Sequence, residues 1–225
     1  MRLDSVQIGV ADLASAGREY ALVFGREPAT VLGGASRFQL CRGAVELEAG
    51  APGVHSLRFV PEANEAPTWP LDPAAFNGLD IRISNPIDAP AFQSAAEAVD
   101  AIDHVVINTP DLDRAIGLWR DRLGVRLALD REFPQRGLRM CFFRSAGMTL
   151  EFVGSLPAPR ERDGPDRFYG LAYQVTDLTR CRTRLLQAGI DVSEVRRGNK
   201  TGTVVATVRS HTSSVPTLLI EEVAR

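Results

Sequence analysis

The sequence has few cysteines, no long apolar run and little net charge. The only cysteines of the 225 residues are Cys41, Cys141 and Cys181, an odd number at wide spacings. Neither a disulfide framework nor a Cys-x-x-Cys metal knuckle can be built from them, so we expect core thiols in a reducing compartment. No stretch approaches the ~20 apolar residues of a membrane span. These absences predict a cytoplasmic protein without a membrane partner.

Charge and short motifs exclude further classes of protein. The formal net charge is -2 and the pI is about 6.0, so the sequence lacks the excess of positive charge that binds a phosphate backbone. We therefore expect no nucleic-acid partner. The chain also has no Gly-rich phosphate loop and no Gly-x-Ser-x-Gly nucleophile elbow. With 44% hydrophobic residues, the chain can bury one sizeable core or two small ones.

An internal repeat is the most informative feature that the chain does contain. Three apolar strands run into an Asp-Leu pair, and a glycine follows each aspartate at a nearly constant distance. The pairs are Asp12 and Gly25, Asp111 and Gly124, and Asp177 and Gly189. The aspartate can cap the first turn of a helix, and the glycine can end it in the left-handed conformation. We therefore predict helices over these intervals, near 111–123 and 177–188 in the second half.

Further strand-like runs follow each glycine and complete a βαβββ unit. A fourth copy, between about 53 and 99, is degraded because Pro61, Pro67, Pro70 and Pro73 exclude a helix of normal length. We expect an irregular excursion over 61–78 and a linker helix from Pro90 to Val99. The predicted domains are an N-terminal half, 1–100, with the first module, the degraded second module and the linker, and a C-terminal domain, 101–225, with the third and fourth modules.

Four such units, with DHVVINTPDLDRAIGLWRDRLG opening the second half and MTLEFV closing its first module, resemble the vicinal-oxygen-chelate superfamily. This superfamily includes glyoxalase, methylmalonyl-CoA epimerase, bleomycin-resistance proteins and extradiol dioxygenases. The resemblance implies an α+β fold in which tandem βαβββ modules pair into cup-shaped mixed sheets. It specifies the fold more than the reaction, since the superfamily hosts isomerases, lyases, oxygenases and binding proteins.

The resemblance also implies metal ligands on the first and last strand of each module. In the third module these positions hold His104 and Glu151. Strand alternation supports both, because Val105 and Ile107 would pack under the helix while His104 faces the cup. An acidic residue inside an apolar strand is costly unless it is paired or metal-bound.

The fourth module departs from the pattern. Gly170 stands opposite His104 in the alignment of the two modules, so one ligand is missing. The last strand offers Glu221, predicted to face the cup, and Glu222, predicted to face outward, while Gln174 is a weak substitute donor. His104, Glu151 and Glu221 together would suit a divalent ion such as Mn, Fe(II), Ni or Zn.

Other polar residues are candidates for proton transfer or substrate binding. His211, in a loop predicted at the cup mouth, and Glu221 are the expected catalytic residues. Three arginines could hold a substrate carboxylate or phosphate, namely Arg139, Arg144 and Arg209. In the N-terminal half Ser5 occupies the first-strand position, with Gln7 two residues on, and Glu46 or Glu48 closes the first module. His55 falls near the first-strand position of the second module, which also offers Arg82. We expect this half to be structural, the alternative being a small ligand pocket.

The predicted function is a glyoxalase-like, metal-dependent enzyme of isomerase or lyase type, acting on a small substrate with adjacent oxygens. One alternative is a metal-free small-molecule binding or drug-sequestering protein of the same fold. A further alternative is an extradiol-type dioxygenase, although Gly170 removes one of the two histidines that those relatives use. The expected partner is a small-molecule substrate or ligand, and a homodimer is compatible with this hypothesis.

Overall fold

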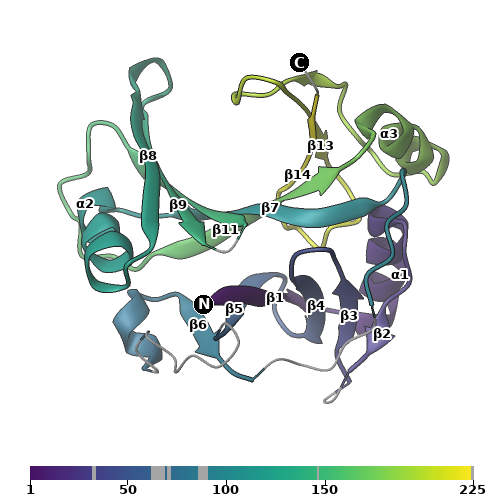
Figure 1. Cartoon of the computed structure of the whole chain (residues 1–225), viewed down its shortest axis with the longest axis horizontal. Helices are drawn as coiled ribbons and strands as arrows, with labels where there is room; N and C mark the ends of the chain where they lie inside the picture. Colours follow the sequence, from purple (N-terminus) through teal and green to yellow (C-terminus); the bar gives the residue numbers. More distant parts are fainter. Residues whose placement is uncertain (32–33, 62–68, 70–71, 86–90, 146, 224–225) are drawn as a thin grey trace.

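The computed structural model describes residues 1–31, 34–61, 69, 72–85, 91–145 and 147–223 of the chain. Within these residues, six strands form a first mixed sheet and eight form a second one. Figure 1 shows the first sheet below the second, with helices at both sides of the molecule. No described helix is long and apolar enough to cross a membrane.

The first sheet has the strand order β2-β3-β4-β1-β5-β6. Its strands are β1 (Arg2–Val10), β2 (Ala29–Thr30), β3 (Ser36–Gln39), β4 (Ala44–Ala49), β5 (Gly53–Val60) and β6 (Asp80–Ile83). Helix α1 (Leu13–Phe24) follows β1. Strand β1 pairs in parallel with β4 and antiparallel with β5, which is the first strand of the second module.

The second sheet repeats this pattern in full, in the order β12-β13-β14-β11-β7-β10-β9-β8. The third module comprises β7 (Val99–Asn108), α2 (Leu112–Ile116) continued by a π-helical segment (Gly117–Arg122), β8 (Arg126–Phe133), a 3₁₀ turn (Pro134–Arg136), β9 (Leu138–Ser145) and β10 (Met148–Ser155). The fourth comprises β11 (Arg167–Val175), α3 (Leu178–Gln187), β12 (Arg196–Arg197), β13 (Thr203–Val208) and β14 (Thr217–Glu222). Parallel pairing of β7 with β10 and of β11 with β14 confirms the predicted βαβββ modules.

The repeated aspartates and glycines act as predicted. The side chains of Asp12, Asp111 and Asp177 accept hydrogen bonds from backbone N–H groups in the first turn of α1, α2 and α3. Gly25, which ends α1, has a left-handed backbone with φ of 67°. Local sequence therefore sets where each helix begins and, in α1, where it ends.

The degraded second module is shorter than the others. Between β5 and β6 the described residues contain a single 3₁₀ turn, Pro73–Phe76, while residues 62–68 and 70–71 of the predicted excursion lie outside the described residues. Prolines oppose a longer helix in this segment, because each one removes a backbone donor and disfavours the helical conformation of the residue before it.

The predicted linker helix from Pro90 to Val99 is wrong over residues 91–99, since residues 91–98 are irregular and β7 already begins at Val99. Arginine side chains bind the backbone carbonyls of this segment. Arg26 donates to the oxygen of Gln93, and Arg184 donates to that of Glu97. A helix of this length is marginal by itself, and these tertiary hydrogen bonds favour the irregular path.

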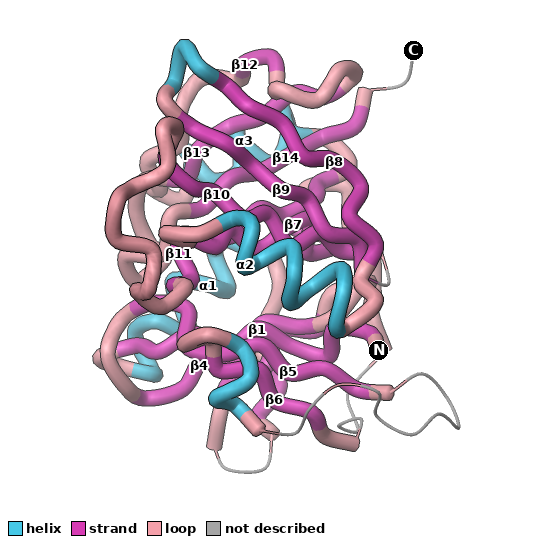
Figure 2. The backbone as a smooth tube through the Cα atoms, turned by 90° about the vertical axis from the view of Figure 1, so that its left-hand side faces the viewer, coloured by secondary structure: helices cyan, strands magenta, loops and turns pink. Residues whose placement is uncertain are grey.

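The two sheets pack through the faces that carry the helices, and their other faces point away from each other. Trp69 of the second module meets Trp119 edge to face, with ring centroids 5.7 Å apart, and Phe24 of α1 meets Tyr173 of β11 at 5.1 Å. Figure 2 shows α2 lying across the second sheet, at the side that turns toward the first sheet. We call the outward face of the second sheet the C-terminal cup and that of the first sheet the N-terminal cup.

The cysteines are free, and two of them are core thiols as predicted. Cys141 and Cys181 are buried, whereas Cys41 is exposed, so the prediction was wrong for that residue. Cys41 stands in the turn between β3 and β4, after the last buried position of the strand, which explains its exposure.

Candidate active site

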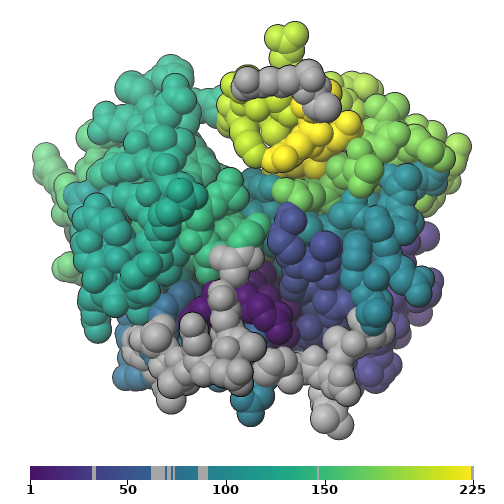
Figure 3. Space-filling view, in the orientation of Figure 1, coloured from purple at the N-terminus to yellow at the C-terminus, as the bar shows by residue number. Residues whose placement is uncertain are grey.

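The C-terminal cup carries the candidate residues of the third module on two neighbouring strands. Val105 of β7 and Phe152 of β10 are fully buried against the helix layer. By strand alternation His104 and Glu151 lie on the opposite face, and their side chains are 15% and 13% exposed. Both predicted residues therefore face the cup. Figure 3 shows this cup as a hollow between the teal wall of the third module and the yellow-green wall of the fourth.

His104 and Glu151 come together, although not by the predicted pairing. Their side-chain atoms Nε2 and Oε2 are 3.5 Å apart. The register pairs His104 with Thr149 and Glu151 with Val106, so the two residues are offset along the strands by two positions and are not direct partners. Both residues nevertheless lie on one face, and their long side chains close the offset.

A third residue, Asp103, completes the cluster and was missed by the sequence analysis. Ala172 pairs with His104, whereas Tyr173 pairs with Ile102, so Asp103 is an extra residue in a β-bulge of β7. Strand alternation predicts that neighbours face opposite ways, but the bulge lets both Asp103 and His104 reach the cup. The bulge has no signature in the sequence, which is why alternation overlooked Asp103.

Asp103 fixes the orientation of the histidine ring. Its Oδ1 lies 2.8 Å from Nδ1 of His104, and its Oδ2 accepts a hydrogen bond of 2.8 Å from Nε2 of Gln174. An ionised carboxylate only accepts, so Nδ1 of His104 carries a proton. When the ring carries this proton alone, its lone pair is on Nε2, the atom that approaches Glu151.

The two carboxyl groups of the cluster have opposite pKa shifts. Burial tends to raise the pKa of Asp103, but the hydrogen bond and charge of His104 and the hydrogen bond from Gln174 outweigh it and hold the pKa below its usual range. Burial raises the pKa of Glu151 above its usual range, against a smaller lowering by His104. Asp103 is therefore the orienting anion, and Glu151 is the more basic of the two carboxylates.

The predicted third ligand, Glu221, does not face the cup. Its Oε2 accepts a hydrogen bond of 2.7 Å from the backbone N–H of Leu178, in the first turn of α3. Glu221 does share a face with Leu219, as the prediction assumed, but Leu219 is fully buried in the main core, on the face that carries the helix. Glu221 thus interacts with the positive end of the α3 dipole and stands away from His104.

Strand pairing identifies which residue of the fourth module corresponds to Glu151. In the third module, Glu151 of β10 pairs with Val106 of β7. The residue of β11 that corresponds to Val106 is Ala172, and it pairs with Leu218 of β14. The fourth module therefore offers Gly170 and Leu218 at its two ligand positions, and neither has a donor side chain. Among the described residues there is no group of three His, Cys, Asp or Glu side chains placed to hold a metal ion.

The two donors that are present suit a cation nonetheless. Two ligand atoms about 2.1 Å from an ion are roughly 3.4 Å apart at tetrahedral positions and roughly 3.0 Å apart at adjacent octahedral ones. The distance of 3.5 Å between His104 Nε2 and Glu151 Oε2 is close to the first value and slightly wider than the second. A carboxylate on the other ring nitrogen, as Asp103 provides, typically accompanies metal-ligating histidine. Hard divalent ions are often held by one or two protein groups, with water and substrate filling the remaining positions.

The other proposed catalytic side chain, His211, lies in a loop on the core side of the second sheet. This loop packs against α1, because the hydroxyl of Tyr20 donates to the carbonyl of Thr212 at a buried contact of 2.9 Å. His211 bonds to the hydroxyl of Ser210, and none of the hydrogen bonds of the described residues joins it to His104 or Glu151. The prediction that this loop forms the cup mouth was therefore wrong.

The three candidate arginines have different surroundings. Arg139 forms ion pairs with Asp113 of α2 and Asp130, which raise its pKa and place it at the helix layer. Arg209 lies 3.5 Å from Asp191 at the surface. Arg144 is exposed and shares the face of Thr149, the partner of His104, so it alone of the three lies on the cup side.

The N-terminal cup is filled by a buried network of charges. Arg37 contacts both Asp4, at 3.1 Å, and Glu46, and their side chains are no more than 5% exposed. Arg58 lies 2.7 Å from Glu46, and Gln7 donates to the same carboxylate at 3.0 Å. Two cations thus balance two anions at the position that His104 and Glu151 occupy in the other half.

The second module contributes three further residues with defined contacts. By its pairing with Gln7, Ser56 and not His55 occupies the first-strand position of the second module, and its hydroxyl donates to Gln7 at 2.8 Å. His55 packs over Gly9, where an added Cβ would lie 2.1 Å from the imidazole ring. Arg82 of the last strand pairs with Asp80.

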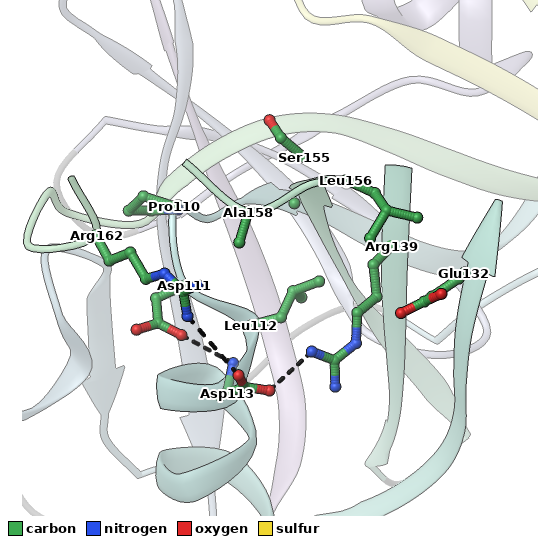
Figure 4. Close-up of a pocket in the computed structure, with 11 residues that line it drawn as sticks. Pro110, Asp111, Leu112, Asp113, Glu132, Arg139, Ser155, Leu156, Ala158 and Arg162 are labelled. Carbon is green, nitrogen blue, oxygen red and sulfur yellow. Dashed lines mark hydrogen bonds and ion pairs between the residues drawn. The ribbon is translucent and has the colours of Figure 1, made fainter. Parts of the chain in front are cut away.

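A small hollow of about 70 Å³ lies near the start of α2. Figure 4 shows Arg139 and Arg162 directed at Asp113 around it, with Leu112 between them. These ion pairs occupy Arg139, Arg162 and Asp113 of its lining. It adjoins the helix layer and contains neither His104 nor Glu151.

Paired βαβββ modules, with the helices on one face of each sheet and a cup on the other, define a protein of the vicinal-oxygen-chelate fold. Residues 103–207 match the Glyoxalase/Bleomycin resistance protein/Dioxygenase superfamily. The matched segment spans the third module and most of the fourth, and it begins at the Asp103–His104 pair.

Two relatives show which proteins resemble the chain. An ethylmalonyl-CoA/methylmalonyl-CoA epimerase of Cereibacter sphaeroides is 25% identical over 100 residues, covering 42% of this chain and 75% of the relative. The Mn(II)-bound glyoxalase of Novosphingobium aromaticivorans has the same fold, with a TM-score of 0.73 and 18% identity over 99% of this chain and 82% of that one. Thus the epimerase match covers less than half of this chain, whereas the glyoxalase match covers both sheets.

Proposed function

We propose that the C-terminal cup is an isomerase-type active site in which His104 and Glu151 hold a divalent cation against a small substrate with adjacent oxygens. The observation that carries this proposal is the 3.5 Å approach of His104 Nε2 to Glu151 Oε2, with Asp103 bound to the other ring nitrogen. The relatives support it, since one is named as an epimerase and another as an Mn(II)-bound glyoxalase.

The residues of the cluster have separate tasks in this proposal. A cation bound by His104 and Glu151 would supply Lewis-acid stabilisation of the negative charge that develops on a substrate carbonyl oxygen when an adjacent carbon loses its proton. Asp103 keeps the Nδ1 proton on His104 and so keeps Nε2 free as a ligand or base. Glu151 would also be the carboxylate that accepts and returns the proton.

Having only two protein donors implies weak binding of the cation in the absence of substrate. Gly170 and Leu218 leave the fourth module without a ligand, so water and the oxygens of the substrate must fill more positions than in a site with three protein ligands. We therefore expect the affinity for Mn²⁺ to increase when substrate is bound, which is a property that linked binding requires.

A second function, metal-free binding of a small molecule, is favoured by the apolar wall of the fourth module. Ala172 and Val205 are fully or almost fully buried in a separate cluster with Ile220, against which Leu218 packs. These side chains share the cup face opposite His104. A ligand with one apolar side would fit between this wall and the polar cluster.

Proton exchange with solvent separates the two functions. The protein is incubated in D₂O with methylmalonyl-CoA, with and without Mn²⁺, and deuterium at the carbon between the two carbonyl groups is followed by mass spectrometry. We expect Mn²⁺-dependent exchange, reduced on the order of 10²-fold or more in His104→Ala and Glu151→Gln but retained in Glu221→Gln. Saturable binding of the thioester without exchange, in either condition, would support the binding protein.

A further inference from the structure

The turn between β3 and β4 brings a residue of the N-terminal half to this site. The backbone N–H of Cys41 donates to the carbonyl of Asp100 in β7, at 2.8 Å, and so fixes the turn beside the second sheet. Arg42 follows, and its Cδ lies so near Gly147 that a Cβ there would be 2.9 Å away. Figure 1 shows the β3–β4 turn rising toward β7 below the C-terminal cup.

Arg42 is connected to His104 through two side chains. Its Nη2 donates to Oε1 of Gln174, whose Nε2 donates to Asp103, whose Oδ1 is bonded to Nδ1 of His104. Arginine only donates hydrogen bonds, so its contact fixes which end of the Gln174 amide is the oxygen. That choice in turn makes the amide a donor to Asp103.

The charge of Arg42 has no counterion in the described part of the chain. Its only side-chain hydrogen bond there is to the neutral amide of Gln174, and its Nε is buried without a hydrogen-bond partner. A half-buried guanidinium in such a position has lost part of its hydration without gaining an anion, which is unfavourable. A carboxylate or phosphate of a ligand would satisfy both the charge and the remaining N–H groups.

The opposite wall of the cup has the same sign of charge. Arg126 of β8 and Arg144 of β9 are direct cross-strand partners, and Arg144 is in turn the partner of Thr149, which faces the cup. Like charges placed opposite one another destabilise a sheet. Both arginines are exposed, and neither forms an ion pair within the described ranges.

We infer that Arg42, contributed by the N-terminal half, is the anion-binding residue of the C-terminal cup, and that the ligand of this cup is a small molecule with a carboxylate or phosphate group. The inference rests on the proposed function for the position of the reacting carbon, which would lie near His104. Arg42 would set which substrates bind, and through Gln174 and Asp103 their binding would be sensed by the histidine ring.

The test uses NMR of the histidine rings in metal-free protein, with malonate, inorganic phosphate and neutral malonamide as probes. The chain has three histidines, so His104→Ala assigns the ring signals. We expect malonate, phosphate or both to shift the His104 signals saturably and malonamide to have no effect. The anion that binds identifies the carboxylate or the phosphate as the recognised group.

The variants decide whether Arg42 is responsible. Arg42→Gln should weaken anion binding at least tenfold, Arg42→Lys should weaken it less, and Arg18→Gln, at an exposed position of α1, should leave it unchanged. Wild-type affinity in Arg42→Gln, or no anion binding by the wild type, would overturn the inference. Should Arg42→Gln not fold, unchanged affinity in Arg42→Lys would count against a guanidinium site, and a severalfold loss would support it.

This outcome is separable from that of the proposed function. Proton exchange that is abolished by His104→Ala while Arg42→Gln binds malonate normally would leave the proposed function intact and overturn the inference about Arg42. Anion binding that depends on Arg42, in a protein without proton exchange, would support the inference about Arg42 and overturn the proposed function.

Discussion

Replacing Arg37 by methionine tests whether the N-terminal cup is a structural network of charges. The side chain is 2% exposed and is in contact with both Asp4 and Glu46. Removing one partner from a buried ion pair typically costs ~3–5 kcal/mol, because the other charge is left uncompensated. Arg58 still lies 2.7 Å from Glu46, so we expect a loss at the lower end, about 3 kcal/mol of unfolding free energy.

The penalty should depend on pH in a defined direction. Burial would raise the pKa of Glu46, but hydrogen bonds from Gln7 and Arg37 and the charges of Arg58 and Arg37 outweigh it and lower the pKa. A lowered pKa means that the carboxylate stabilises the fold above its unfolded pKa, and that this contribution is lost as the pH falls through the folded value. Arg37→Met should therefore cost most near neutral pH and progressively less in acid.

Urea denaturation followed by tryptophan fluorescence measures both effects, since Trp69 and Trp119 are buried where the two sheets meet. Arg18→Met, at an exposed position, is the control and should change stability by less than about 0.5 kcal/mol. Adding Glu46→Leu to Arg37→Met removes the unpaired carboxylate, and should restore about 2 kcal/mol. A penalty below about 1 kcal/mol, or one that does not vary with pH, would refute the structural role of the network.

Three further predictions concern the C-terminal half. Glu221→Gln should lower the unfolding free energy by about 1–2 kcal/mol, because it weakens the hydrogen bond to the N–H of Leu178. The His104 ring signals in NMR should not change, and altered signals would mean that Glu221 contacts the cup. Trp119→Ala should cost about 3–5 kcal/mol in urea denaturation, because it leaves a cavity beside Trp69, and a cost below about 1 kcal/mol would contradict the packing described here. In EDTA, the stability difference between Glu151→Gln and the wild type should shift in favour of Glu151→Gln as the pH rises from the ordinary carboxyl pKa through the raised pKa of Glu151, since ionisation of that buried carboxyl opposes folding. A difference that stays constant with pH, or shifts in favour of the wild type, would contradict the raised pKa.

The repeat in the sequence was sufficient to predict the modules, because each helix begins at a local signal. Asp12, Asp111 and Asp177 cap their helices through their own side chains, which depends on neighbouring residues only. The segment 91–98 shows the limit of local reasoning. Its alanines favour a helix, but Arg26 and Arg184, which come from distant parts of the chain, bind its carbonyls instead.

The site was predicted in part, and the errors came from strand register. Alternation placed His104 and Glu151 on the cup face, because both lie beside fully buried neighbours such as Val105. It could not show that a bulge brings Asp103 to the same face. Alternation correctly placed Glu221 on the same face as Leu219. It could not show whether this face is the cup or the helix side, because that depends on the packing of Leu219 in the core.

Pulsed electron paramagnetic resonance of Mn²⁺ tests the central claim most directly, namely that His104 and Glu151 hold a divalent cation in the C-terminal cup. In protein saturated with Mn²⁺ and supplied with methylmalonyl-CoA, we expect the nitrogen coupling of a single imidazole ligand. His104→Ala should abolish this coupling, and Glu151→Gln should weaken the retention of Mn²⁺, whereas His211→Ala should change neither. A nitrogen coupling that persists in His104→Ala, or Mn²⁺ that stays free in the presence of the wild-type protein, would contradict the account.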